Sequence, residues 1–188
     1  MKKNIILSVF YLWTAVCFSQ QLNDSIQSNK GSHVYLDLLG GVVVGNPNGF
    51  GFGLTGNFQN KKDLFSLRLL YVLDSDELIS DILNFNNGES INELAILYGK
   101  CFLHKKSIIS ISMGASTNIW KYQVMTNNAL LNKRKQYIAL PFEAKIITFK
   151  NTKEKFGMLF GAKLFGSFGK ATFLGLGFNL SFGKHKRQ

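Results

Sequence analysis

Three histidines and two cysteines are the residues of this sequence best suited to acid–base or nucleophilic chemistry. They are His33, His104, His185, Cys17 and Cys101. A nucleophilic side chain needs a base within hydrogen-bond reach, so a catalytic interpretation depends on where the fold places the histidines. Their spacing does not match a zinc site, and two cysteines are too few for a disulfide framework. We expect no metal and no cofactor.

Six charged residues form a second candidate set, because each stands within a segment that is otherwise nearly free of charge. They are Asp37, Arg68, Glu93, Glu143, Lys145 and Lys163. Three acids match three bases. Such a set can line an ion path or, where the surrounding space is filled, form a network of buried ion pairs. Because unpaired buried charges are costly, the balance of signs favours a network.

Composition limits the fold that must position these residues. The chain has 188 residues, which fits one domain, and a formal net charge of +11. Hydrophobic residues make up 46% and charged residues only 18%. These values exclude a disordered chain. We expect no nucleic-acid partner despite the positive charge, because the first residues predict export.

Residues 1–19 have the pattern of a secretory signal peptide. Lys2 and Lys3 precede an apolar stretch, and small residues follow at the expected cleavage site after Ser19. The alternative is a lipoprotein signal acylated at Cys17, although Val16 is bulkier than the small residue expected there. Residues 20–31 are polar and predict a flexible leader. No later run approaches the roughly 18–20 apolar residues of a membrane helix.

From residue 32 onward, apolar and small or polar residues alternate with the period of a β-strand. In one segment Phe65, Leu67 and Leu69 interleave with Ser66 and Arg68. Eight such segments lie near residues 33–38, 50–58, 65–71, 93–99, 109–114, 138–146, 157–164 and 174–182. Their lengths and even number predict an all-β fold, an eight-stranded antiparallel transmembrane barrel with up-and-down meander topology, over residues 32–188. Pro141 lacks a ladder donor and counts against a regular strand unless a bulge absorbs it, so the register around Pro141 stays open.

The charge of each face indicates which side meets lipid. The apolar face carries no charge except Lys100, whereas the opposite face holds the six charged residues among many small ones. A water-facing exterior should carry more charges than this. The pattern favours a membrane barrel with a narrow polar interior. The alternative is a soluble lipocalin-like carrier whose apolar side points inward.

The connections predict the orientation. Short polar turns near residues 60–63, 104–106 and 151–155 alternate with long connections at 74–90 and 121–136. Short turns and both termini are expected on the periplasmic side, with the long loops outside. Within 74–90 a capping box predicts a short helix over the barrel mouth. Trp120 and Tyr122 are expected to join an aromatic girdle.

The last segment carries the most specific resemblance. Residues 172–182 alternate through Leu176, Phe178 and Leu180 and close on the aromatic Phe182. This resembles the C-terminal assembly signal of small outer-membrane barrels, and residues 32–183 resemble the OmpA/OmpX-like family. The tail 183–188 departs from the members that end on the aromatic residue. We expect no peptidoglycan-binding domain after the barrel, so that role of OmpA is not expected to carry over.

The resemblance implies a bacterial outer-membrane protein. Barrel enzymes of this size use His with Ser and an acid near the outer rim, whereas all three histidines here are expected at the periplasmic end. We therefore favour a non-enzymatic, structural or partner-binding barrel with a plugged lumen. The alternatives are a lipid-modifying barrel enzyme and the soluble carrier.

Charges outside the strands suggest partners. The predicted periplasmic turns and tail carry a net positive charge, which suits anionic headgroups or an acidic protein. The loop 74–90 is acidic and the loop 121–136 is basic. The expected partners are outer-membrane lipid and lipopolysaccharide, the barrel-assembly machinery during insertion, and a periplasmic or membrane protein.

Overall fold

The computed structural model describes a single closed antiparallel barrel of eight strands. The residues described are 32–75, 89–104, 107–126, 129–148 and 156–184. The predicted signal peptide, the leader and the helix within 74–90 lie outside these ranges, apart from the ends of the last. Among the described residues, no helix is long and apolar enough to cross a membrane.

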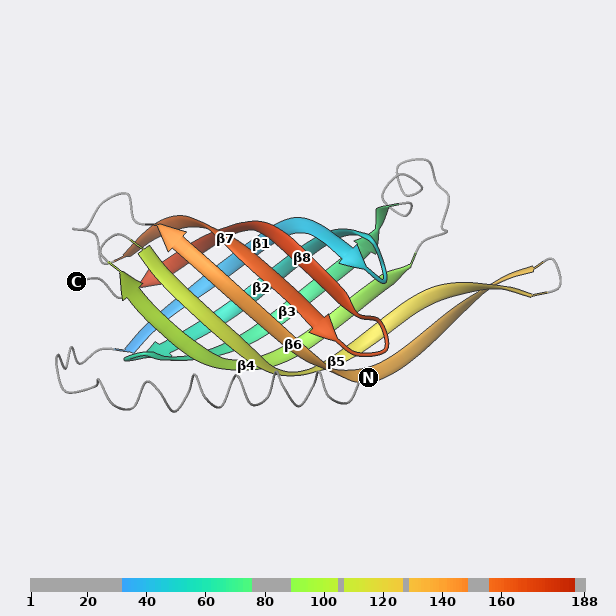
Figure 1. Cartoon of the computed structure of the whole chain (residues 1–188), viewed down its shortest axis with the longest axis horizontal. Helices are drawn as coiled ribbons and strands as arrows, with labels where there is room; N and C mark the ends of the chain where they lie inside the picture. Colours follow the sequence, from blue (N-terminus) through green and yellow to red (C-terminus); the bar gives the residue numbers. More distant parts are fainter. Residues whose placement is uncertain (1–31, 76–88, 105–106, 127–128, 149–155, 185–188) are drawn as a thin grey trace, which may run out of the picture. The chain divides into compact units, whose positions relative to one another are not determined.

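Each strand pairs with the next one in the chain, which confirms the meander (Figure 1). The strands are β1 (Ser32–Gly45), β2 (Gly49–Asn60), β3 (Asp63–Asp74), β4 (Ser90–His104), β5 (Ser107–Thr126), β6 (Ala129–Thr148), β7 (Phe156–Phe168) and β8 (Phe173–Lys184). The barrel closes where β8 pairs with β1, for example Leu38 with Leu180. We call the end where β1 starts and β8 finishes the termini end, and the other the hairpin end.

The alternation of residue types becomes an alternation of environment. In β3, Phe65, Leu67 and Leu69 are each at least 50% exposed, whereas Ser66 and Arg68 between them are at most 4% exposed. The other strands follow the same rule, so the apolar face points out of the barrel and the polar face points into the lumen. The predicted assignment of the two faces is confirmed.

The barrel accommodates Pro141 without a bulge. The β5–β6 ladder pairs Met113 with Phe142 and resumes, in the same register, at Ser116 with Ala139. The ladder lacks two residue pairs between these points, but neither strand contains an extra residue. On its other side Pro141 pairs with Ser167 of β7. The missing N–H of proline therefore interrupts one ladder without shifting the strand.

The region 121–136 was expected as a loop and is instead a β-hairpin. β5 and β6 stay paired out to Thr126 and Ala129. Their outer neighbours stop earlier: β4 pairs with β5 only as far as Lys121, and β7 pairs with β6 only from Leu140. The two strands therefore run on past the barrel as a ribbon (Figure 1).

Candidate functional site in the barrel lumen

The six charged residues predicted as one set do come together inside the barrel. They belong to β1, β3, β4, β6 and β7, and none is more than 3% exposed. Each sits on an inward-facing position because its strand keeps the period of two. A set of charges scattered over 127 positions of sequence, from Asp37 to Lys163, is thus concentrated in one narrow space.

The charges form a chain in which the sign alternates at every step. Arg68 holds Glu93 Oε1 through Nε at 3.0 Å and Nη2 at 2.7 Å. Its Nη1 lies 3.5 Å from Glu143 Oε2, across the lumen on β6. That same carboxylate oxygen is 3.4 Å from Lys163 Nζ.

The second half of the chain runs from Lys163 to Lys145 through one carboxylate. Asp37 Oδ2 lies 3.5 Å from Lys163 Nζ and 2.6 Å from Lys145 Nζ. Lys145 Nζ also stands 4.7 Å from the ring centre of Tyr35. The resulting order is Glu93, Arg68, Glu143, Lys163, Asp37, Lys145. Every internal member therefore has an opposite charge on both sides.

Neutral polar groups complete the shell of Asp37. Ser181 Oγ donates to Asp37 Oδ1 at 2.6 Å, and Asn57 Nδ2 donates to Oδ2 at 2.9 Å. Asn57 is held in turn by Ser66, whose Oγ donates to its Oδ1 at 2.7 Å. Hydrogen bonds to a charged acceptor are among the stronger ones in proteins. This shell fixes the carboxylate between its two lysines.

Main-chain carbonyls complete the shell of Arg68. The guanidinium donates to Phe142 O and to Gly166 O, both at 3.3 Å. A buried cation is stabilised only when its remaining donors find acceptors. Arg68 therefore contacts β4, β6 and β7 at once, and we regard it as the central residue of the network.

Two apolar clusters of buried side chains occupy the lumen beyond the network, and the polar-face prediction missed both. The cluster nearer the hairpin end comprises Leu39, Val43, Leu70, Val72, Ile91, Tyr137, Ala139, Phe165, Ala171 and Phe173. The cluster nearer the termini end comprises Tyr35, Leu64, Cys101 and Ile108. The sequence did carry a signal, because all of these residues except Ala171, which lies in the β7–β8 turn, continue the inward parity of their strands. Eight-stranded barrels have interiors that side chains just fill.

The histidines do not form a catalytic constellation in the part of the chain that the structure describes. His33 lies at the start of β1 and His104 at the end of β4, both at the termini end. His185 falls outside the described residues. No cluster of three metal-binding side chains was found among the residues with a described position. Cys101 is a free, buried thiol within an apolar cluster.

Trp120 differs from its expected place in an aromatic girdle. Its ring packs against the lumen cluster near the hairpin end instead of facing outward. Tyr122 stacks on it, with ring centres 4.4 Å apart. Both residues occupy positions of β5 whose side chains point into the lumen, which explains why they do not join an outward-facing girdle. The strand that was expected to end here continues, so the lumen face continues with it.

The fold can be compared directly with solved structures. Neisserial surface protein A is 9% identical, with a TM-score of 0.54, and the match covers 83% of this chain and 99% of that one. Ail, the attachment invasion locus protein of Yersinia pestis, is 9% identical, with a TM-score of 0.50 and coverage of 84% and 100%. The barrel domain of Pseudomonas aeruginosa OprF is 16% identical, with a TM-score of 0.48 and coverage of 81% and 98%.

The chain has the fold of the small eight-stranded outer-membrane barrels. The predicted resemblance is thereby confirmed at the level of fold. No protein-family model and no curated protein sequence matches the chain. The predicted assembly strand is β8, in which Leu176 and Phe178 point outward with exposed fractions of 58% and 85%. Leu180 and Phe182 continue the same face at the termini end.

Proposed function

We propose that this protein is a non-enzymatic component of a bacterial outer membrane, whose barrel is closed to solutes and whose role is structural or partner-binding. In this proposal the signal peptide directs export, the termini end faces the periplasm and the hairpin end faces outward. The longest connection, residues 75–89 between β3 and β4, and the ribbon of β5 and β6 both lie at the hairpin end, which supports this orientation.

The observation that carries the proposal is the exposure of large apolar side chains around the whole wall. Members of the set come from every strand, including Val34, Phe52, Leu67, Ile96, Ile111, Ile138, Phe160 and Leu176. Soluble monomers rarely expose a contiguous apolar surface of this extent. A hydrocarbon environment makes the same surface favourable, and a closed barrel suits that environment because its backbone groups pair between strands.

This arrangement argues against a soluble carrier. A lipocalin-like carrier would place its apolar residues inside, around a ligand. Here the inside holds Asp37, Arg68 and Lys163, each fully buried, and the apolar residues face out. A chain that folds and purifies from the periplasm without detergent would overturn the membrane assignment.

The filled lumen supports a closed barrel. An ion entering from either end meets an apolar cluster and then the charge chain, whose members already hold one another at 2.6 to 3.5 Å. Displacing these partners leaves buried charges uncompensated. We expect purified protein in planar bilayers to show no steady conductance. Regular ion-selective openings would overturn this part of the proposal.

The lipid-modifying enzyme is the alternative that needs its own test. Lipid A extracted from cells with and without expression should have the same acyl composition. A changed acyl count that His33→Ala abolishes would establish an enzyme and contradict the proposal. His33 is the informative position because it is the described histidine on the lumen-facing parity of its strand.

A further inference from the structure

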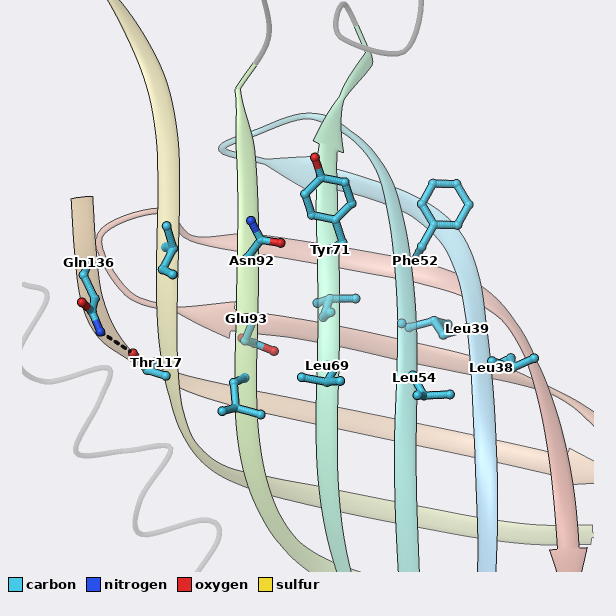
Figure 2. Close-up of a pocket in the computed structure, with 14 residues that line it drawn as sticks. Leu38, Leu39, Phe52, Leu54, Leu69, Tyr71, Asn92, Glu93, Thr117 and Gln136 are labelled. Atoms are coloured by element: carbon cyan, nitrogen blue, oxygen red, sulfur yellow. Dashed lines mark hydrogen bonds between the residues drawn. The ribbon is translucent and has the colours of Figure 1, made fainter. Parts of the chain in front are cut away.

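A groove of about 770 Å³ lies in the barrel wall where β1 to β6 stand side by side (Figure 2). Most of its lining points out of the barrel. The apolar part of that lining includes Leu38, Phe52, Leu54, Leu69 and Leu94. The lining also includes the buried, inward-facing Leu39, Leu70 and Glu93, but its exposed residues are the outward ones, so the groove opens toward the surroundings of the barrel. In a membrane it faces acyl chains.

The groove becomes polar toward the hairpin end. Asn92, Thr117 and Gln136 line it, and all three are exposed on a face that is otherwise apolar. Gln136 Nε2 donates to Thr117 Oγ1 at 3.2 Å (Figure 2). Amides facing hydrocarbon are costly unless they find partners. This end of the groove therefore suits the polar junction of a lipid, where hydroxyl, ester or amide groups begin.

Two cations follow directly beyond the polar part. Asn92, Ile119 and Gln136 are cross-strand neighbours, and Lys121 and Arg134 lie two residues further along β5 and β6 on the same face. Two residues of strand correspond to roughly 7 Å. Lys121 and Arg134 are paired with each other, and both are exposed.

This pairing of like charges indicates an anionic ligand. Like charges directly opposite each other on a β-ribbon are destabilising. Residues 119–137 contain no acid that could offset this pair, and Lys133 and Lys135 add two more positive charges on the opposite face of the ribbon. An anion held between Lys121 and Arg134 removes the repulsion. The apolar part of the groove, its polar end and the cationic rim therefore follow one another along the wall. An anionic lipid has its acyl chains, polar junction and charged headgroup in the same order.

We propose that the groove binds a phosphorylated glycolipid of the lipid A type. Its acyl chains lie against Leu54, Leu69 and Leu94, and a phosphate sits between Lys121 and Arg134. The inference rests on the proposed function, because it needs the hairpin end to lie in the outer leaflet. The occupant is chosen by charge complementarity at the rim and by the leaflet in which that rim would lie.

The first test measures lipid retention by the full chain. Native mass spectrometry of the detergent-solubilised protein, titrated with lipid A, should give a one-to-one complex. Lys121→Ala/Arg134→Ala should weaken it by roughly tenfold or more, because both phosphate contacts are lost. The control is Lys62→Ala/Lys170→Ala, which removes two positive charges from the β2–β3 and β7–β8 turns. Equal affinity of the two double variants would overturn the proposal.

The second test blocks the groove without changing charge. Leu94→Trp should fill the groove and weaken lipid A binding, whereas Ile96→Trp should not. The two residues share β4 and its outward face, but Ile96 does not line the groove. Equal binding by both tryptophan variants would contradict the assigned position of the acyl chains.

The remaining outcomes separate this inference from the proposed function. Phosphatidylglycerol binding as tight as lipid A binding would overturn the glycolipid assignment, and so would a protein dimer that excludes lipid. Folding into vesicles is measured separately by the faster migration of unheated protein on a gel. Protein that inserts into vesicles but holds no lipid A contradicts the inference alone, whereas failure to insert contradicts the proposed function.

Discussion

The lumen and the outer wall are built from the same strands, yet their residues follow opposite rules. Arg68 is fully buried and its neighbour Leu69 is 50% exposed. In a water-soluble protein the two side chains would exchange environments. In this barrel the usual relation is reversed, because charged side chains are buried and apolar side chains are exposed. Charges are buried because they pair with one another, and apolar groups are exposed because their surroundings are expected to be lipid.

The two regions also differ in how they depend on their neighbours. Each lumen charge depends on a specific opposite charge from another strand, as Arg68 of β3 depends on Glu93 of β4 and Glu143 of β6. An outward leucine depends only on an apolar medium. Substitutions in the lumen should therefore destabilise the barrel through loss of a partner. Substitutions on the wall should act through the membrane.

Arg68→Ala should have the largest effect, because it leaves Glu93 and Glu143 without their central cation. Removing one partner of a buried ion pair typically costs about 3–5 kcal/mol. Urea unfolding in detergent micelles should show a strongly lowered midpoint, and Lys62→Ala in the β2–β3 turn is the control. If the two variants unfold at the same midpoint, the network is hydrated and the contrast between lumen and turn fails.

Leu69→Arg should have the next largest effect, through the membrane. A cation on the lipid face near the bilayer midplane costs roughly 2–4 kcal/mol. The yield of folded protein in vesicles should fall, while Leu69→Phe should insert normally. Harmless insertion of Leu69→Arg together with improved insertion of Arg68→Leu would mean that the two faces are inverted.

Two glycines, one facing the lumen and one facing outward, allow the two regions to be compared by the addition of a single methyl group. A Cβ at Gly175 would come 2.3 Å from the ring of the fully buried Phe165, whereas a Cβ at the outward Gly56 meets nothing within 4 Å. Overpacking a filled interior typically costs about 1–3 kcal/mol. Gly175→Ala should lower the unfolding midpoint and Gly56→Ala should not. Equal midpoints would indicate that the lumen has room to adjust.

The smallest effect is expected at the rim, where an ion pair lies outside the lumen. Lys100 Nζ is 2.8 Å from Asp63 Oδ1, and both side chains are 38% exposed. Such pairs typically contribute less than about 1 kcal/mol. Lys100→Ala should shift the urea midpoint only slightly, and salt should reduce the shift further. A loss as large as that of Arg68→Ala would remove the distinction between rim and lumen.

The strand period made the barrel and its two faces predictable from the sequence, because one parity carries nearly all the charge. Membership of the lumen network was predictable for the same reason. The order of its ion pairs was not. Which base meets Glu143 depends on the stagger of β3, β6 and β7 around the closed barrel, and neighbouring sequence does not encode that stagger directly.

Two local features are not predictable from the sequence, for different reasons. The ribbon beyond Lys121 does not alternate as a strand should, because its apolar residues come in adjacent pairs, Val124 with Met125 and Leu130 with Leu131. At Pro141 the sequence leaves the register open, because proline lacks a donor. The barrel omits two ladder pairs and keeps its register. The helix expected within 74–90 lies mostly outside the described residues and stays a prediction.

The most direct test of the central claim is refolding of the purified mature chain from urea with and without lipid vesicles. The outward apolar wall predicts that folding requires the vesicles. It also predicts that the inserted protein migrates faster on a gel when unheated and resists protease within its eight strands. A chain that folds to a soluble, stable monomer in buffer without lipid or detergent would contradict the claim.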